Sequence, residues 1–255
     1  MNEKLRLPAA DPRTIARDIP GLLDTLFPHL LPGIVAFFNR TSRRITGCKP
    51  IPKSAVDETG LQKAMLFELA FAVGEQLVSS IGSLDWEVCL AVAVARQRRH
   101  FDARVPDRIT EKDRAVALAV GVNLAKMLEV LRVENACSPV IRTPHIPGYE
   151  WIASGAGDFA IGLHLVEVKC TNKHFSSSDY RQLLMYWLLG YAAKLEEKAA
   201  EWQTGILLNP RSAKLVQISF SELVNVTGGG RSKLEILELF GSIVATRAAE
   251  FRPFG

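Results

Sequence analysis

The sequence predicts a mixed α/β (α+β) fold, in which helices flank a mixed central sheet and an N-terminal helical region is added to this core. The first 109 residues show helical patterns that Pro and Gly interrupt. From residue 110 the predicted order becomes α-β-β-β-α-β-β-α, which is typical of a sheet covered by helices. We therefore expect a helical region at 1–109 and a core domain at 110–255.

Apolar periodicity indicates where the helices of the first part lie. They are expected at 12–27, 33–38, 60–80 and 84–100. A further helix should begin after Thr110, because Asp113 stands three residues later as the reciprocal partner of an N-cap. This helix is expected to continue to about residue 133.

The second part of the chain alternates between strand and helix patterns. Strands are expected at 140–143 and 149–153, followed by a hairpin over 158–169 and a helix over 178–201. Two more strands, at 205–208 and 215–220, should surround a turn at 209–211, and a last helix should cover 232–247.

Composition restricts the class of protein. The formal net charge of +4 permits an anionic partner without demanding one. The N-terminus has no apolar core of a signal peptide, and the strongly apolar stretch at 88–95 is far shorter than a membrane span. The cysteines form no CxxC pair and are expected to be reduced thiols of a cytoplasmic protein: Cys48, Cys89, Cys137 and Cys170.

The hairpin at 158–169 concentrates charged side chains. If its turn is formed by Gly162 and Leu163, a type II′ turn, then Asp158 lies directly opposite Glu167. Lys169 is two residues beyond Glu167 and therefore shares its face of the sheet. Two opposed carboxylates repel each other, and a divalent cation between them removes that penalty. Mg²⁺ (or Mn²⁺) suits such a site, because Mg²⁺ is typically held by one or two carboxylates and water.

These residues resemble the signature of the PD-(D/E)XK nuclease superfamily, which has an acidic residue at one strand and a Glu-x-Lys on the next. The resemblance implies a restriction-endonuclease-like core. It also implies that Asp158 and Glu167 bind the metal, with the Val168 carbonyl as a further ligand. Lys169 would then serve the nucleophile.

The resemblance extends into the following helix. Gln182 and Tyr186 form the QxxxY pattern of the RecB-like branch and share one helix face, which places Gln182 among the implied catalytic residues. Many members also carry a glutamate on the first core helix, and here Glu129 or Asn123 stands at that place. Gly157 replaces the proline of the signature. A second Glu-x-Lys, at 196–198, falls in a helical pattern and carries no such meaning.

The resemblance implies a metal-dependent nuclease that acts on nucleic acid, with DNA expected ahead of RNA, in a prokaryotic defence or mobile-element setting. The alternative is a catalytically silent nucleic-acid-binding or regulatory subunit of a larger nuclease or helicase complex. A homodimer or another protein partner is compatible with both. The pattern does not distinguish endonuclease from exonuclease action.

Other residues are candidates for contacts with phosphate. Two basic clusters either neutralise phosphates or complement helix ends: Arg96, Arg98, Arg99, His100, Arg104 and Arg108, and Arg40, Arg43, Arg44, Lys49 and Lys53. Arg211 and Lys214 follow a strand and are further candidates. His174 lies in the loop after Lys169, which borders the expected site, whereas His164 is expected at the hairpin turn or edge.

Overall fold

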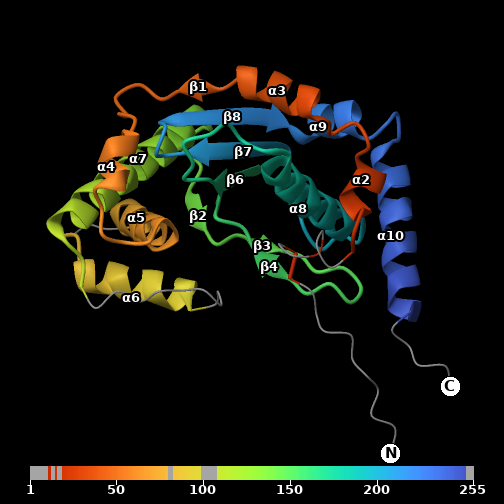
Figure 1. The fold of residues 1–255 in the computed structure, drawn as a ribbon. Coiled ribbons are helices and arrows are strands. Elements are labelled where there is room, and N and C mark those ends of the chain that lie inside the picture. Colours follow the sequence, from red (N-terminus) through yellow and green to blue (C-terminus); the bar gives the residue numbers. More distant parts are fainter. Residues whose placement is uncertain (1–10, 13–14, 16–18, 80–82, 99–107, 251–255) are drawn as a thin grey trace, which may run out of the picture.

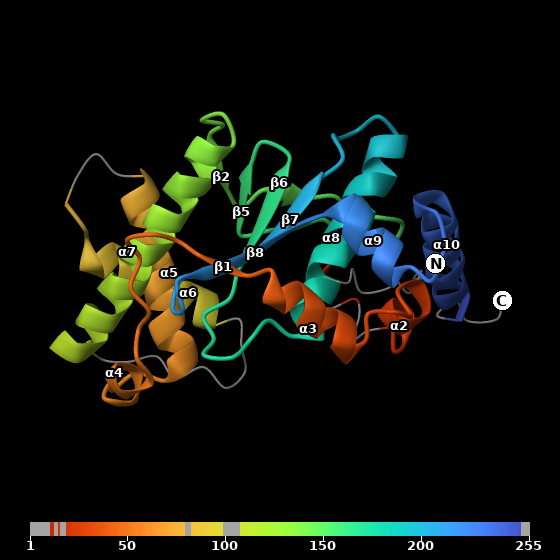
Figure 2. The ribbon, with the colours of Figure 1, turned by 90° about the horizontal axis from the view of Figure 1, so that it is seen from above.

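The computed structural model describes residues 11–12, 15, 19–79, 83–98 and 108–250. A mixed sheet runs through this part of the molecule, and helices cover both of its faces (Figures 1 and 2). The predicted mixed α/β class is therefore confirmed.

The first helices form two groups, which lie toward opposite ends of the molecule (Figure 2). Their bounds are α2 (Leu22–Leu26), α3 (Pro32–Arg40), α4 (Lys53–Asp57), α5 (Lys63–Ser79), α6 (Trp86–Gln97) and α7 (Glu111–Glu134). Helix α5 packs along α7 and also against α6, and the three share an apolar cluster. The predicted capping box forms, since the Thr110 hydroxyl accepts from the Asp113 backbone while the Asp113 carboxylate accepts from the Thr110 backbone.

The main sheet has six strands in the order β1-β8-β7-β6-β5-β2. Their bounds are β1 (Arg43–Arg44), β2 (Val140–Arg142), β5 (Phe159–Ile161), β6 (His164–Val168), β7 (Thr204–Asn209) and β8 (Lys214–Ser219). Strands β6 and β7 are parallel and are connected through helix α8 (Ser177–Leu195), whereas the other neighbours are antiparallel. A crossover helix is what a parallel pair requires.

Alternate side chains of the strands enter different apolar clusters. Leu165 and Leu207 belong to the cluster built around α8, whereas Val166, Ile206 and Leu208 belong to the cluster beneath α7. This alternation is the period of two that a strand imposes when both faces of its sheet are covered. Odd-numbered residues of β6, including Glu167, are thereby directed to the α8 face.

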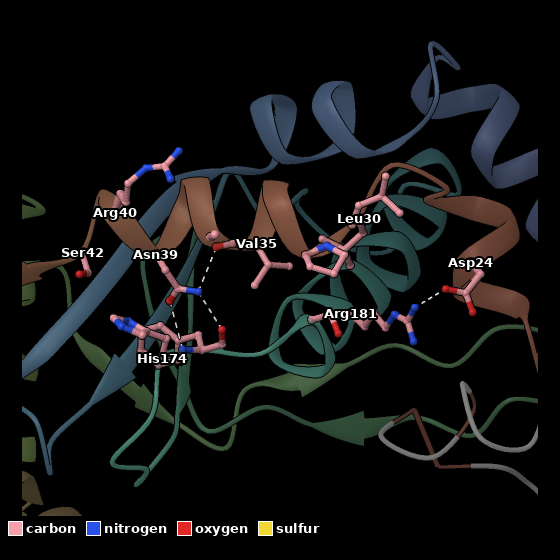
Figure 3. Close-up of a pocket in the computed structure, with 13 residues that line it drawn as sticks. Asp24, Leu30, Val35, Asn39, Arg40, Ser42, His174 and Arg181 are labelled. Atoms are coloured by element: carbon pink, nitrogen blue, oxygen red, sulfur yellow. Dashed lines mark hydrogen bonds and ion pairs between the residues drawn. The ribbon is translucent and has the colours of Figure 1, made fainter.

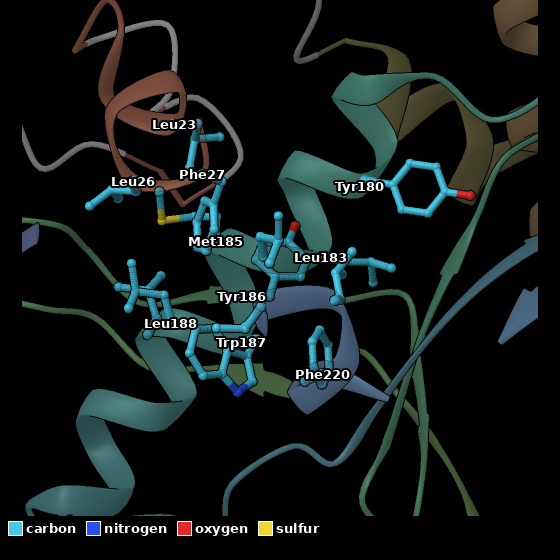
Figure 4. Close-up of a cluster of buried hydrophobic side chains, with 14 of the residues drawn as sticks. Leu23, Leu26, Phe27, Tyr180, Leu183, Met185, Tyr186, Trp187, Leu188 and Phe220 are labelled. Carbon is cyan, nitrogen blue, oxygen red and sulfur yellow. The ribbon is translucent and has the colours of Figure 1, made fainter. Parts of the chain in front are cut away.

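Helix α8 is the centre of the larger cluster (Figure 4). Tyr186 and Trp187 are fully buried in it, and Leu23, Leu26 and Phe27 of the α2 region pack from the opposite side. Helices α9 (Phe220–Thr227) and α10 (Lys233–Glu250) complete this layer. A helix buried on most of its surface is held rigidly, and any side chain that it presents to the sheet is therefore well positioned.

A second, two-stranded sheet extends the β2–β5 pair. Its strands are β3 (His145–Ile146) and β4 (Gly155–Ala156), and they continue the β2–β5 register beyond a break at Thr143. The prediction of a strand at 149–153 is wrong. Tyr149 and Ile152 instead bridge each other across a tight turn in which Glu150 has a φ of 53°.

Three other element boundaries differ from the prediction. The helix expected to reach residue 201 ends at Leu195, because Glu197 adopts a φ of 58°. The strand expected at 215–220 ends at Ser219, whose hydroxyl caps α9 by accepting from the Glu222 amide. Of the helix expected at 12–27, the segment Leu22–Leu26 is helical after a left-handed Gly21, and residues 13–14 and 16–18 lie outside the described part.

The predicted division at 109/110 is crossed by several contacts. Strand β1 pairs with β8, and α5 packs along α7, so segments from both sides share one structure. All four cysteines are free thiols. None of the helices in the described ranges combines the length and apolar character needed to cross a bilayer.

Candidate active site

The hairpin that carries the candidate site forms with the predicted register. Its two-residue turn begins at Gly162, which has a φ of 57°, as the first position of a type II′ turn requires. Phe159 pairs with Val166. One further step in this register sets Asp158 directly opposite Glu167, at a position between the ladder hydrogen bonds, where opposed side chains lie closest.

Asp158 is held by both neighbouring strands. Its carboxylate Oδ2 accepts a hydrogen bond from the Val168 amide at 2.8 Å, and its carbonyl accepts from the Thr143 amide at 3.0 Å. Thr143 has a φ of 48°, which is uncommon for a β-branched residue. The break in the β2–β3 strand thus lies beside Asp158, at the point where the carboxylate must be oriented.

Glu167 is buried, with 1% of its surface exposed, and is the centre of a polar network. Its Oε2 accepts from Gln182 Nε2 at 2.9 Å and from Lys169 Nζ at 3.4 Å. Gln182 Oε1 accepts from the same Lys169 ammonium at 2.7 Å, and Gln182 Nε2 also donates to the Tyr186 hydroxyl at 2.9 Å. The structure therefore brings together the Glu-x-Lys segment and both residues of the QxxxY pattern.

Helix α8 positions Gln182, because the N-terminus of this helix is fixed by a cap. The Ser176 hydroxyl and the Asp179 carboxylate form a capping box at the end of the loop that follows Lys169. Gln182 and Tyr186 are one turn apart, so they lie on the same face and reach the same end of β6. The surrounding helix is buried, which restricts the rotamers of both side chains.

The carboxylate of Glu167 has both a cationic and a neutral partner. A buried carboxylate is costly unless it is paired and hydrogen-bonded, and Gln182 and Lys169 provide these partners for Glu167. Lys169 is itself 24% exposed at its side chain, so the ammonium also reaches solvent. Asp158 adds a second carboxylate at this end of the sheet, and a cation bound between the two carboxylates would offset their repulsion.

A further acidic residue, which the sequence did not predict, lies on helix α5. Both carboxylate oxygens of Glu75 accept from Arg96 Nη2, at 2.8 and 2.7 Å. Burial raises the pKa of Glu75, Arg96 and Arg142 oppose this rise, and the charge of Asp158 adds to it. Glu75 therefore lies within electrostatic reach of Asp158. The signal that could have revealed it is a carboxylate in an otherwise apolar helical stripe.

The two candidates on the first core helix are engaged elsewhere. Glu129 is exposed, binds Arg132 at 2.7 Å and borders a pocket with Val140, at the opposite end of the β2–β5 pair from Asp158. The Asn123 amide is buried and donates to the carbonyls of Lys49 and Pro210, which ties the N-terminal segment to the β7–β8 turn. Neither side chain takes part in the network around Glu167.

The donor set for a metal is small. Among the described residues, no three His, Cys, Asp or Glu side chains converge in a metal-binding arrangement. The available donors are the opposed carboxylates of Asp158 and Glu167. Such a pair fits Mg²⁺, which takes oxygen ligands, retains several waters and shares the phosphate of its substrate. It does not fit a structural zinc site, which needs four protein ligands.

Several cations of the predicted basic clusters make internal contacts. Arg96 is held by Glu75 and stacks over Phe71, and Arg43 pairs with Glu134. Arg211 is buried and lies over the ring of Phe67. Residues 99–107 lie outside the described part. Exposed cations of these clusters that remain for a phosphate backbone are Arg40, Arg44, Lys49, Arg98 and Arg108.

Comparisons do not place the chain in a family. No family model matches it, and neither a curated protein nor a solved structure does. A functional conclusion therefore depends on the geometry of the site.

Proposed function

We propose that this chain is a metal-dependent nuclease that hydrolyses phosphodiester bonds, with DNA as its substrate. The observation that carries the proposal is the network at the end of β6. There a buried Glu167, the ammonium of Lys169 and the amide of Gln182 meet opposite Asp158. A solvated strand face would not require a glutamate that is almost completely buried.

The order of the elements supports the resemblance to the PD-(D/E)XK superfamily. In the main sheet, helix α7 is followed by the antiparallel strands β2, β5 and β6, then by α8 and by β7, which is parallel to β6; the separate β3–β4 sheet is inserted between β2 and β5. This is the α-β-β-β-α-β order expected of such a core. Asp158 directly precedes the second of these strands and Glu167 lies on the third, an arrangement that supports the resemblance.

Each side chain has a role in the proposed reaction. Asp158 and Glu167 would hold Mg²⁺ or Mn²⁺, which when bound polarises the scissile phosphate and lowers the pKa of a bound water. Lys169 orients the attacking water through its ammonium and offsets the negative charge that develops on the phosphate. Gln182 is a positioning residue, because it fixes both Glu167 and Lys169 through separate atoms.

The direct test compares the wild type with Lys169→Ala and with a matched control, Lys198→Ala. Lys198 belongs to the second Glu-x-Lys segment and is 71% exposed at its side chain. Each protein is incubated with linear, circular and single-stranded DNA in Mg²⁺, Mn²⁺ or EDTA. We expect metal-dependent cleavage by the wild type and by Lys198→Ala, and none by Lys169→Ala.

The outcomes separate the proposal from its alternatives. Cleavage of circular DNA identifies an endonuclease. Failure to cut DNA or RNA, combined with no affinity for Mn²⁺ in calorimetry, overturns the proposal and favours a silent nucleic-acid-binding or regulatory subunit. Equal cleavage by Lys169→Ala and the wild type would show that the reaction, if present, takes place elsewhere.

A further inference from the structure

A cleft of about 870 Å³ lies between helices α3 and α8 (Figure 3). This volume is within the roughly 300–1,000 Å³ of pockets that hold small ligands. Its α3 wall is apolar and is formed by Leu31, Pro32, Val35 and Ala36. Leu31 is 56% exposed, so this apolar wall is open to solvent.

The shape of the cleft is fixed by one buried amide. Asn39, at the end of α3, donates from Nδ2 to the carbonyls of Val35 and Phe175, at 2.9 and 2.8 Å. Its Oδ1 accepts from the Phe175 amide at 3.1 Å. These bonds tie α3 to the β6–α8 loop over a sequence separation of 136 residues. The two walls are thus held in place without a ligand.

The opposite wall carries cationic and polar groups. Arg181 projects from α8 and pairs with Asp24 through one of its terminal nitrogens, and His174 is exposed on the adjacent loop (Figure 3). The Arg181 side chain is 34% exposed, so part of its guanidinium is accessible. A guanidinium presents its donors in a fork that suits a phosphate. The cleft therefore offers a cationic donor opposite an apolar wall.

The cleft and the proposed catalytic centre are carried by the same two segments. Arg181 precedes Gln182 on α8, and Gln182 binds Lys169 and Glu167. The loop that carries His174 begins immediately after Lys169. The wall of the cleft and the centre therefore depend on the same helix and the same loop for their positions.

We infer that this cleft binds one unstacked nucleotide unit, with its base against the α3 wall and its phosphate at Arg181. The inference rests on the proposed nuclease function and adds a substrate class to it. A base enters such a cleft after it has left a duplex stack, so the substrate is single-stranded or frayed near the cut. The unit belongs to a nucleic-acid strand or to a free nucleotide, which share this chemistry.

The first test fills the cleft from an exposed position. Ala36→Trp places an indole in the cleft, and Phe37→Trp is the matched control, because Phe37 is exposed on the same helix and does not line the cleft. Binding of a fluorescein-labelled ten-residue oligothymidylate is measured by anisotropy in EDTA, which prevents cleavage. We expect Ala36→Trp to weaken binding about fivefold or more, and Phe37→Trp to match the wild type.

The second test separates charge from structure at one ion pair. Arg181→Gln and Asp24→Asn both break the same pair, but only the first removes the cation. We expect Arg181→Gln to weaken oligothymidylate binding and to lower the slope of log Kd against log salt by about 0.7. Asp24→Asn should bind at least as tightly as the wild type, because it frees Arg181 for phosphate.

The outcomes distinguish a failure of the cleft inference from a failure of the proposed nuclease function; these are the two levels of the proposal. If Ala36→Trp binds oligothymidylate like the wild type, or if both charge variants weaken binding equally, the cleft inference is overturned while metal-dependent cleavage still stands. Competition by thymidine 5′-monophosphate at similar concentration assigns the cleft to a free nucleotide, whereas its failure to compete assigns it to a strand. A wild type that neither binds nor cuts nucleic acid overturns both levels.

Discussion

The chain contains the Glu-x-Lys pattern twice, and the two copies have different environments. In the segment Glu196–Lys198 the ammonium lies 2.6 Å from the carboxylate, whereas Lys169 lies 3.4 Å from Glu167. By distance alone the first pair would be the stronger. Yet its side chains are 55% and 71% exposed, against 1% and 24% for Glu167 and Lys169.

The exposed copy, at Glu196–Lys198, takes part in ending helix α8. Glu197 adopts the left-handed conformation, its amide donates to the Lys194 carbonyl, and the Lys198 amide donates to the Ala193 carbonyl. This is the Schellman motif that ends a helix. An ion pair in water contributes about 0–1 kcal/mol and has no fixed geometry. The comparison teaches that burial and additional hydrogen-bond partners, rather than the spacing of the motif, distinguish a candidate catalytic pair.

The largest expected effect comes from exchanging the two glutamates for alanine separately. Glu167→Ala should lower the rate of DNA cleavage by at least about a hundredfold, since it removes a proposed metal donor and the anchor of Lys169. Glu196→Ala should cut DNA at the wild-type rate. Initial rates in Mg²⁺ are compared, with circular dichroism to confirm folding. Equal losses in the two variants would contradict the distinction drawn between the copies.

A smaller effect is expected from Gln182→Ala, which removes the link between Glu167 and Lys169. We expect the affinity for Mn²⁺ to fall by about 10–100-fold, because such supporting residues orient metal ligands. Calorimetry in the absence of DNA measures this, so the result does not depend on cleavage. Gln203→Ala is the control, since Gln203 is exposed. An unchanged Mn²⁺ affinity in Gln182→Ala would show that the glutamine is merely structural.

Sequence patterns predicted the parts of the fold that depend on local signals. The Thr110 cap, the Gly162 turn and the register of the hairpin follow from residues only a few positions apart. Strand β1 was missed, because Arg43 and Arg44 become a strand by pairing with β8 across about 170 residues. The strand expected at 149–153 failed because a positive φ at Glu150 turns the chain back on itself.

The residues of the candidate site also divide into those that local patterns predicted and one that was missed. Asp158, Glu167, Lys169 and Gln182 lie within 25 positions, and a hairpin followed by a helix is sufficient to bring them together. Glu75 was missed because its approach to Asp158 depends on how α5 packs against α7 and α6. No spacing rule connects a helix at 63–79 with a strand some 80 residues later. Tertiary packing determines that proximity.

Two buried tyrosines on α8 show how much a hydrogen-bond partner for a buried hydroxyl contributes to stability. Tyr180 is fully buried, and its hydroxyl has no hydrogen-bond partner among the described residues, whereas the Tyr186 hydroxyl accepts from Gln182. Tyr180→Phe should raise stability by about 1 kcal/mol, because it removes an unsatisfied buried group. Tyr186→Phe should lower stability by about 1 kcal/mol. Urea unfolding measures both, and a loss of stability in Tyr180→Phe would contradict the comparison.

The smallest effect is expected at the other end of β6, where His164 is half-buried and its Nδ1 has no hydrogen-bond partner in the described part of the chain. Burial lowers the pKa of His164. The unfolded chain therefore takes up the proton first as the pH falls below about 6.5. The free energy of unfolding should therefore decrease as the pH falls from about 6.5 to the pKa of His164 in the folded protein. Below that pKa, His164 causes no further loss of stability.

His164→Gln should make the wild-type pH dependence shallower in this window, without changing cleavage at neutral pH. Unfolding free energies at several pH values between 5 and 8 give the difference between the two proteins. Identical profiles would mean that the imidazole is as well solvated in the folded state as in the unfolded state. In that case burial without partners would have no measurable cost at this end of the strand, and the contrast with Glu167 would depend on its polar network alone.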